Sequence, residues 1–128
     1  MLFILMVLSI LTVLFIPQIV KTIEKQQSIH FFKLFDSDIL FIQNQTMNSD
    51  DTYRITLTKD YYMIVKENRE IEKREYPNHL TLSQRNVRIY FSKSGTVTSP
   101  QTIRFQDRYH TYRVVFPLGK GRHYIEVR

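Results

Sequence analysis

MLFILMVLSILTVLFIPQIV, residues 1–20, decides how the rest of the chain must be arranged. Fourteen of these twenty residues are Leu, Ile, Val or Phe, and none carries a charged side chain. A helix of about 20 apolar residues spans the hydrocarbon core of a bilayer. The fourteen side chains together favour insertion by about 4–8 kcal/mol. Residues 1–20 are therefore predicted to form a transmembrane helix.

Ser9, Thr12 and Pro17 are among the residues of this segment that differ from its apolar majority. Ser9 and Thr12 can return their hydroxyl groups to backbone carbonyl groups inside the helix, so they are compatible with burial in lipid. Pro17 removes one backbone donor and is expected to kink or locally open the helix. It lies near the end of the apolar run, where the freed carbonyl group can be satisfied by neighbouring helices or by the head-group layer.

A cleaved signal peptide is the alternative interpretation of residues 1–20. Such a peptide begins with a basic segment and ends at a cleavage site of small residues. Here no Lys or Arg precedes the apolar run, and no Ala-x-Ala-like pattern follows it. The run instead continues into a further helical pattern, which favours the membrane anchor.

Residues 21–47 have the periodicity of an amphipathic helix. Phe31 or Phe32, Phe35, Ile39 and Ile42 recur at steps of three and four. No Gly or Pro interrupts residues 18–47, and residues 48–51 are typical of a helix end and a turn. A continuous helix would be about 46 residues, or roughly 69 Å, long. The polar residues expected on the opposite face are Lys21, Lys25, Gln26, Lys33, Asp36 and Gln43.

From Tyr53 onward the apolar residues change to a period of two, which is typical of strands. The connections between the apolar runs are too short for crossover helices, so antiparallel pairing is expected. Turns are predicted at Lys59-Asp60, at Ser94-Gly95 and at residues 119–121. The predicted strands are residues 53–58, 61–66, 70–76, 79–82, 87–92, 102–106, 112–116 and 124–128.

The predicted fold class is α+β, with a long N-terminal helix packed on a small antiparallel β-sheet. Residues 1–20 form its transmembrane part, residues 21–47 its amphipathic continuation, and residues 48–128 the β-sheet domain. A small sheet with one apolar face must bury that face. The apolar stripe from Phe31 to Ile42 is the expected cover.

This order of elements resembles type IV pilins and the pseudopilins of type II secretion and DNA-uptake systems. In residues 1–18 an apolar helix leads to Pro17-Gln18, and residues 88–95, 102–105 and 112–128 are similar to a pseudopilin turn, strand and last hairpin. The resemblance covers nearly the whole chain and is closest to the ComGD group of competence pseudopilins. It implies a type IV pilin-like fold and a minor structural subunit of a machine that takes up transforming DNA.

The resemblance also implies a location, partners and processing. It implies a single-pass protein of the cell membrane, with the sheet domain outside the cytoplasm, whose helix later packs with other pilin or pseudopilin subunits in a surface fibre. The family's peptidase site and its conserved Glu would lie just before Met1, so an upstream segment ending in a Phe-Thr-Leu-Ile-Glu-like run is expected. The residues implied to contact membrane and neighbouring helices are Leu2, Phe3, Leu5, Leu8, Leu11, Phe15 and Pro17.

The last third of the chain is basic, since Asp107 and Glu126 are the only acids after Glu75. Basic and aromatic side chains together bind nucleic acid, and wall polymers or lipid head groups attract the same charges. A membrane-tethered domain that binds DNA or another polyanion is therefore the alternative function. The simpler interpretation is a solvated sheet face with subunit contacts. The candidate contacts are Arg88, Lys93, Arg104, Arg108, Arg113, Lys120 and Arg122.

The sequence contains no arrangement typical of an enzyme. The chain has no Cys, which excludes disulfides and thiolate ligands. No Gly-x-Ser-x-Gly elbow or phosphate loop occurs, and the Glu residues between 67 and 75 are expected on solvated strands. We expect no catalytic residue, cofactor or metal. The four histidines are too far apart to predict a metal site and are expected at or near the surface: His30, His79, His110 and His123.

Overall fold

The computed structural model describes residues 1–117 and 122–128. One α-helix, α1 (Leu2–Asn48), continues through Pro17 and ends one residue beyond the predicted boundary. The hydroxyl groups of Ser9 and Thr12 donate to the carbonyl oxygens of Leu5 and Leu8, each at 2.8 Å, as predicted. The 47 residues thus form one continuous helix, about 70 Å long.

The described residues after the helix form two antiparallel sheets, where one was predicted. The first sheet has the strand order β3-β2-β1-β5, and the second has the order β4-β6-β7-β8. The division arises because β5 pairs with β1, whereas β4 before it pairs with β6. The turn predicted at residues 119–121 lies outside the described residues. The strands are β1 (Tyr53–Leu57), β2 (Tyr61–Lys66), β3 (Arg69–Glu75), β4 (Thr81–Leu82), β5 (Val87–Tyr90), β6 (Gln101–Gln106), β7 (Thr111–Phe116) and β8 (Tyr124–Val127).

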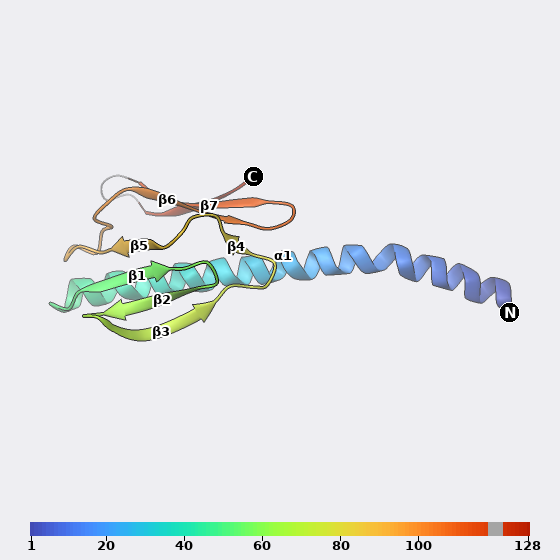
Figure 1. Ribbon diagram of the computed structural model, residues 1–128, viewed down its shortest axis with the longest axis horizontal. Coiled ribbons are helices and arrows are strands. Elements are labelled where there is room, and N and C mark those ends of the chain that lie inside the picture. The colour runs from blue at the N-terminus through green and yellow to red at the C-terminus, as the bar shows by residue number, and fades with distance from the viewer. Residues whose placement is uncertain (118–121) are drawn as a thin grey trace.

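The second half of α1 runs along both sheets, and the first half extends beyond them (Figure 1). The predicted stripe is buried: Phe35, Ile39 and Ile42 have no exposed surface, and Phe31 and Phe32 have almost none. The predicted α+β arrangement is therefore confirmed, with the apolar stripe as the shared cover of the sheets.

Aromatic rings connect the helix to both sheets. The ring of Phe31 meets Tyr62 of β2 edge to face at 5.9 Å between centroids, and Phe105 of β6 at 5.6 Å. Phe32 reaches Tyr112 of β7 at 4.8 Å. Edge-to-face pairs add roughly 0.5–1.5 kcal/mol each beyond the burial of their surface. Residues of the helix and of both sheets thus form one core.

The turn predicted at Ser94-Gly95 is present, and it touches the end of the helix. The amide of Gly95 donates to the carbonyl oxygen of Ser92 at 2.8 Å, and Gly95 has a φ of +76°. A Cβ atom at this position would lie 3.1 Å from Cγ of Met47 and 3.3 Å from the carbonyl oxygen of Gln43. Both the backbone conformation and the close approach therefore require glycine here.

Candidate assembly and contact surfaces

The N-terminal part of α1 makes no core contact with the sheets. Every residue from Met1 to Val20 is exposed, and apolar side chains surround the helix on all sides. By length and composition the helix is apolar enough to cross a membrane. A helix that is apolar all round is stable only when lipid or protein surrounds it. We refer to this exposed part of α1, residues 1–20, as the rod. The predicted assembly residues all lie on it: Leu2, Phe3, Leu5, Leu8, Leu11, Phe15 and Pro17.

Two of the predicted polyanion contacts lie side by side. Arg104 of β6 is directly opposite Arg113 of β7. Both point away from the core, because Ile103 and Val114, their neighbours along the strands, are fully buried. Nη1 of Arg113 lies 3.2 Å from the carboxylate of Glu126 on β8. The outer face of the second sheet therefore carries two arginines and one acid in a single row.

The other predicted contacts are spread over the domain. Arg88 is exposed on β5, at the edge of the first sheet. The ammonium nitrogen of Lys93 lies 3.0 Å from the carboxylate of Asp50, just beyond the end of α1. Lys93 therefore lies at the end of the domain that is farthest from residues 1–20. Arg108 is exposed at the opposite end, in the connection between β6 and β7. Arg122 is exposed ahead of β8, and Lys120 lies outside the described residues.

An acid on the apolar face of α1 forms a polar link to the first sheet, which the sequence pattern did not predict. Asp38 is 8% exposed, and its carboxylate accepts a hydrogen bond of 2.6 Å from the hydroxyl group of Tyr62. Nε of Arg74 on β3 donates to the same oxygen at 2.8 Å. The pKa of Tyr62 is raised by burial and by the adjacent carboxylate. The pKa of Arg74 is raised by its hydrogen bond to Asp38.

Two histidines also connect the helix to other segments. His79, between β3 and β4, shares a hydrogen bond of 2.7 Å with the hydroxyl group of Ser28. His123, ahead of β8, pairs with the carboxylate of Asp36 and stacks on Phe116. Asp36, predicted on the polar face of the helix, keeps a side chain that is 49% exposed, whereas the side chain of His123 is 7% exposed. Across residues 1–117 and 122–128, no group of three His, Asp or Glu side chains could hold a metal ion.

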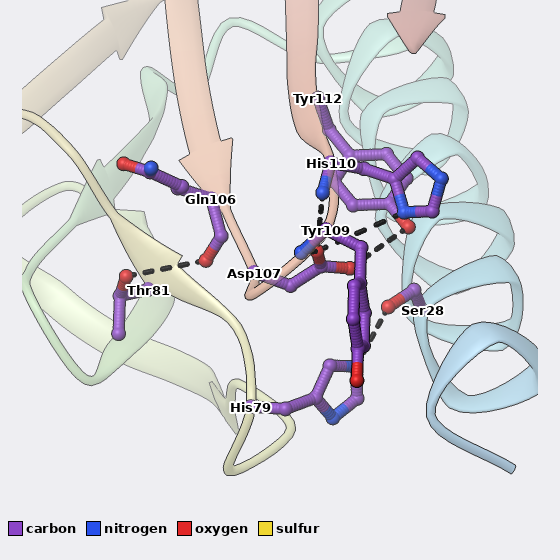
Figure 2. Close-up of polar contacts among 8 residues, drawn as sticks. All are labelled: Ser28, His79, Thr81, Gln106, Asp107, Tyr109, His110 and Tyr112. Atoms are coloured by element: carbon purple, nitrogen blue, oxygen red, sulfur yellow. Dashed lines mark hydrogen bonds and ion pairs between the residues drawn. The ribbon is translucent and has the colours of Figure 1, made fainter. Parts of the chain in front are cut away.

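The turn between β6 and β7, residues 107–110, is built around one carboxylate (Figure 2). Oδ1 of Asp107 accepts hydrogen bonds from the backbone amides of Tyr109 at 2.7 Å and His110 at 2.6 Å. Oδ2 accepts a hydrogen bond of 3.2 Å from the hydroxyl group of Tyr112. Burial alone would raise the pKa of Asp107, but these hydrogen bonds lower it below its ordinary value.

The β6–β7 turn contacts α1 where the exposed rod ends. The ammonium nitrogen of Lys21 lies 4.9 Å from the centre of the Tyr109 ring, which is a cation–π distance. Ser28 of α1 and His79 lie close to the same turn (Figure 2). Lys21 is the first charged residue of the chain. The turn therefore marks the end of the sheet domain that is nearest to the apolar rod.

The molecule is an α+β protein in which one long apolar-to-amphipathic helix packs on antiparallel sheets, an arrangement consistent with a pilin-like fold. Comparison of the chain with protein-family models, with curated proteins and with solved structures finds no match.

Proposed function

We propose that the chain is a minor pseudopilin of the ComGD type, a structural subunit of a pilus-like machine for the uptake of transforming DNA. One observation carries the proposal: a single helix is bare and apolar over residues 1–20 and is packed into the domain core over its second half. That division suits a subunit that is stored in a membrane and then assembled by its helix.

The physics of helix association supports such a cycle. Lipid tails are as apolar as Leu side chains, so a helix that leaves lipid for a bundle of other helices loses little hydrophobic stabilisation. Packing between helices and the entropy of the lipids then decide whether the helix stays in lipid or joins the bundle. Because α1 is continuous from Leu2 to Asn48, a force on the sheet domain is transmitted along the whole helix. In this proposal the partners are other pilin or pseudopilin subunits, and the sheets lie outside the cytoplasm.

Deletion of the gene in its native host tests this function. Transformation by added DNA should fall by orders of magnitude and should be restored by the wild-type gene. Labelled DNA protected from external nuclease should fall in parallel, because uptake itself is lost. Transformation by electroporation, which bypasses the machine, is the control and should not change. Normal uptake in the deletion strain would contradict the proposal.

Binding of DNA or another polyanion is the second candidate function, and the Arg104–Arg113 row favours it. Like charges directly opposite each other on neighbouring strands are destabilising, and a bound phosphate would relieve the repulsion. Glu126 compensates only part of this charge, at 3.2 Å from Arg113. The polyanion is then held on the outer face of the second sheet, away from the helix.

DNA binding by the full chain in lipid nanodiscs tests the second candidate. The helix must be kept, because Phe35 and Ile39 are fully buried against the sheets. Binding should weaken with salt, and Arg104→Gln or Arg113→Gln should each reduce the slope against log salt by about 1. Arg69→Gln, at an exposed position on β3 of the other sheet, is the matched control. Equal effects of all three substitutions would contradict a defined site.

A further inference from the structure

We propose that the β6–β7 turn, together with Lys21, is a membrane-surface contact that binds anionic lipid head groups. This proposal rests on insertion of residues 1–20 in a bilayer and is independent of whether the chain is a pseudopilin. The partner is a bilayer surface, not a second protein. Four observations support it: the length of the rod, the Lys21–Tyr109 contact, the exposure of the turn and the engagement of the Asp107 carboxylate in hydrogen bonds within the turn.

The length of the rod places Lys21 at the membrane surface. Twenty helical residues rise about 30 Å, which is the thickness of the hydrocarbon core. Lys21 is therefore the first charged side chain to reach the head groups on the side of the sheet domain. Because its ammonium nitrogen lies 4.9 Å from the Tyr109 ring, the β6–β7 turn is held at the same depth.

The turn presents the chemistry of an interfacial contact. Tyr109 remains 56% exposed despite its contact with Lys21, and Arg108 beside it is exposed. Tyr side chains gather at membrane–water interfaces, where the ring meets the acyl boundary and the hydroxyl group stays wet. Each Lys or Arg near an anionic surface contributes about 1 kcal/mol.

The acidic groups near the turn oppose this attraction only weakly. The carboxylate of Asp107 is 7% exposed and is engaged by the amides of Tyr109 and His110. Glu24 is half-buried on the same stretch of α1, whereas Lys25 next to it is exposed. On the β6–β7 turn and at Lys21, the side chains free to meet head groups are thus mainly cationic, whereas the exposed Glu75 belongs to β3 of the other sheet. The same hydrogen bonds fix the shape of the turn, so Arg108 and Tyr109 need little ordering on contact.

Two contacts fix the end of the domain that would face the membrane. The Lys21–Tyr109 contact holds the β6–β7 turn against α1. The Ser28–His79 hydrogen bond, drawn in Figure 2, holds the β3–β4 connection against the same helix. The domain would therefore sit on the bilayer instead of swinging on its helix. Withdrawal of the rod from lipid would then have to break this surface contact as well.

The absence of Trp from the chain allows a direct test. The full chain carrying Tyr109→Trp is reconstituted in vesicles whose lipids are brominated near the head-group end of the acyl chain. Tyr90→Trp, on the outer face of β5, and Phe15→Trp, within the rod, are the matched controls. Fluorescence of Tyr109→Trp should be quenched several-fold more than that of Tyr90→Trp. Vesicles of anionic phosphatidylglycerol should give stronger quenching than those of neutral phosphatidylcholine.

Each outcome of this experiment has one meaning. Quenching of Phe15→Trp without quenching of Tyr109→Trp would overturn the surface contact while leaving the membrane anchor in place. No quenching of Phe15→Trp would overturn both the contact and the anchor. Arg108→Gln combined with Lys21→Gln, in the Tyr109→Trp background, should abolish the preference for anionic vesicles. Equal quenching in both lipids before this change would overturn the role of anionic head groups.

Discussion

The carboxylate of Asp38 on α1 lies 2.6 Å from the hydroxyl group of Tyr62 on β2, inside an otherwise apolar interface. Arg74 on β3 approaches the same carboxylate at 2.8 Å. A buried charge is tolerated only when it is paired and hydrogen-bonded. Here the carboxylate of Asp38 accepts hydrogen bonds from side chains of two strands, β2 and β3. The link sets the position of α1 along the first sheet, because a shift by one residue would leave all three groups without partners.

Asp38→Ala should destabilise the fold by about 2–4 kcal/mol, since it leaves the Tyr62 hydroxyl group and the Arg74 guanidinium group without their acceptor. Tyr62→Phe removes one hydrogen bond but leaves the Asp38–Arg74 pair, so it should cost only about 0.5–1.5 kcal/mol. Urea unfolding of the full chain in detergent micelles measures both free energies. Equal losses for the two variants would contradict a shared acceptor at Asp38.

Gly95→Ala should also destabilise the domain, by about 1–3 kcal/mol. The substitution forces a side chain into the left-handed region, at a cost of about 1–2 kcal/mol, and places Cβ 3.1 Å from Met47. Adding Met47→Ala to Gly95→Ala should recover only the steric cost that Met47 imposes, because the φ of +76° and the 3.3 Å approach to the carbonyl oxygen of Gln43 remain. Thermal unfolding of the single and double variants separates the two contributions. Full recovery in the double variant would show that the backbone conformation costs nothing.

Leu11→Arg and Leu40→Arg compare the two halves of α1 at equal exposure, since both leucines are 45% exposed. Arg at the centre of a membrane helix costs about 3–4 kcal/mol relative to Leu, so Leu11→Arg should reduce the membrane-bound fraction. Leu40→Arg should leave that fraction unchanged, because residue 40 lies in the half of the helix that packs on the sheets. Membrane fractionation of cells expressing each variant measures the difference. Similar fractions for the two variants would argue against a membrane role for residues 1–20.

The Asp107 carboxylate should make the β6–β7 turn sensitive to acid. Its pKa in the folded chain is lower than in the unfolded chain, so it adds stability above its ordinary pKa of 3.8. That contribution is lost as the pH falls through the lower folded-state pKa. Asp107→Asn should reduce stability at pH 7 and should also flatten the dependence of the unfolding free energy below about pH 4. Measurements of the unfolding free energy from pH 7 to pH 2 check both effects. If this free energy fell as steeply with acid in the variant as in the wild-type chain, Asp107 would not be the source of the acid sensitivity.

Much of this architecture could be predicted from the sequence, because its periodicities are strong. The steps of three and four at Phe31, Phe35, Ile39 and Ile42 gave the buried face of α1, and the last helical residue differs by one. The period-two runs gave eight strands, most within one or two residues of their bounds. These signals are local, since each depends on which side chains share a face.

The division into two sheets could not be predicted in the same way. It depends on β5 pairing with β1 and β4 pairing with β6, and such pairings are made by residues far apart in the chain. The Asp38 link did leave a signal, because a charged residue three positions after Phe35 and four before Ile42 lies on the apolar stripe. The partners of that charge, Tyr62 and Arg74, become visible only in the folded structure.

The proposed function requires that residues 1–20 lie in lipid and also pack with the helices of other subunits. Replacing Phe15 with the photo-cross-linker benzoylphenylalanine in competent host cells tests this claim most directly, with Tyr90 on the outer sheet face as the control position. We expect a membrane-dependent adduct from position 15 that contains another protein with an apolar N-terminal helix and disappears when the assembly motor is deleted. Recovery of the chain as a free soluble monomer with its rod removed, and no such adduct from position 15, would contradict it.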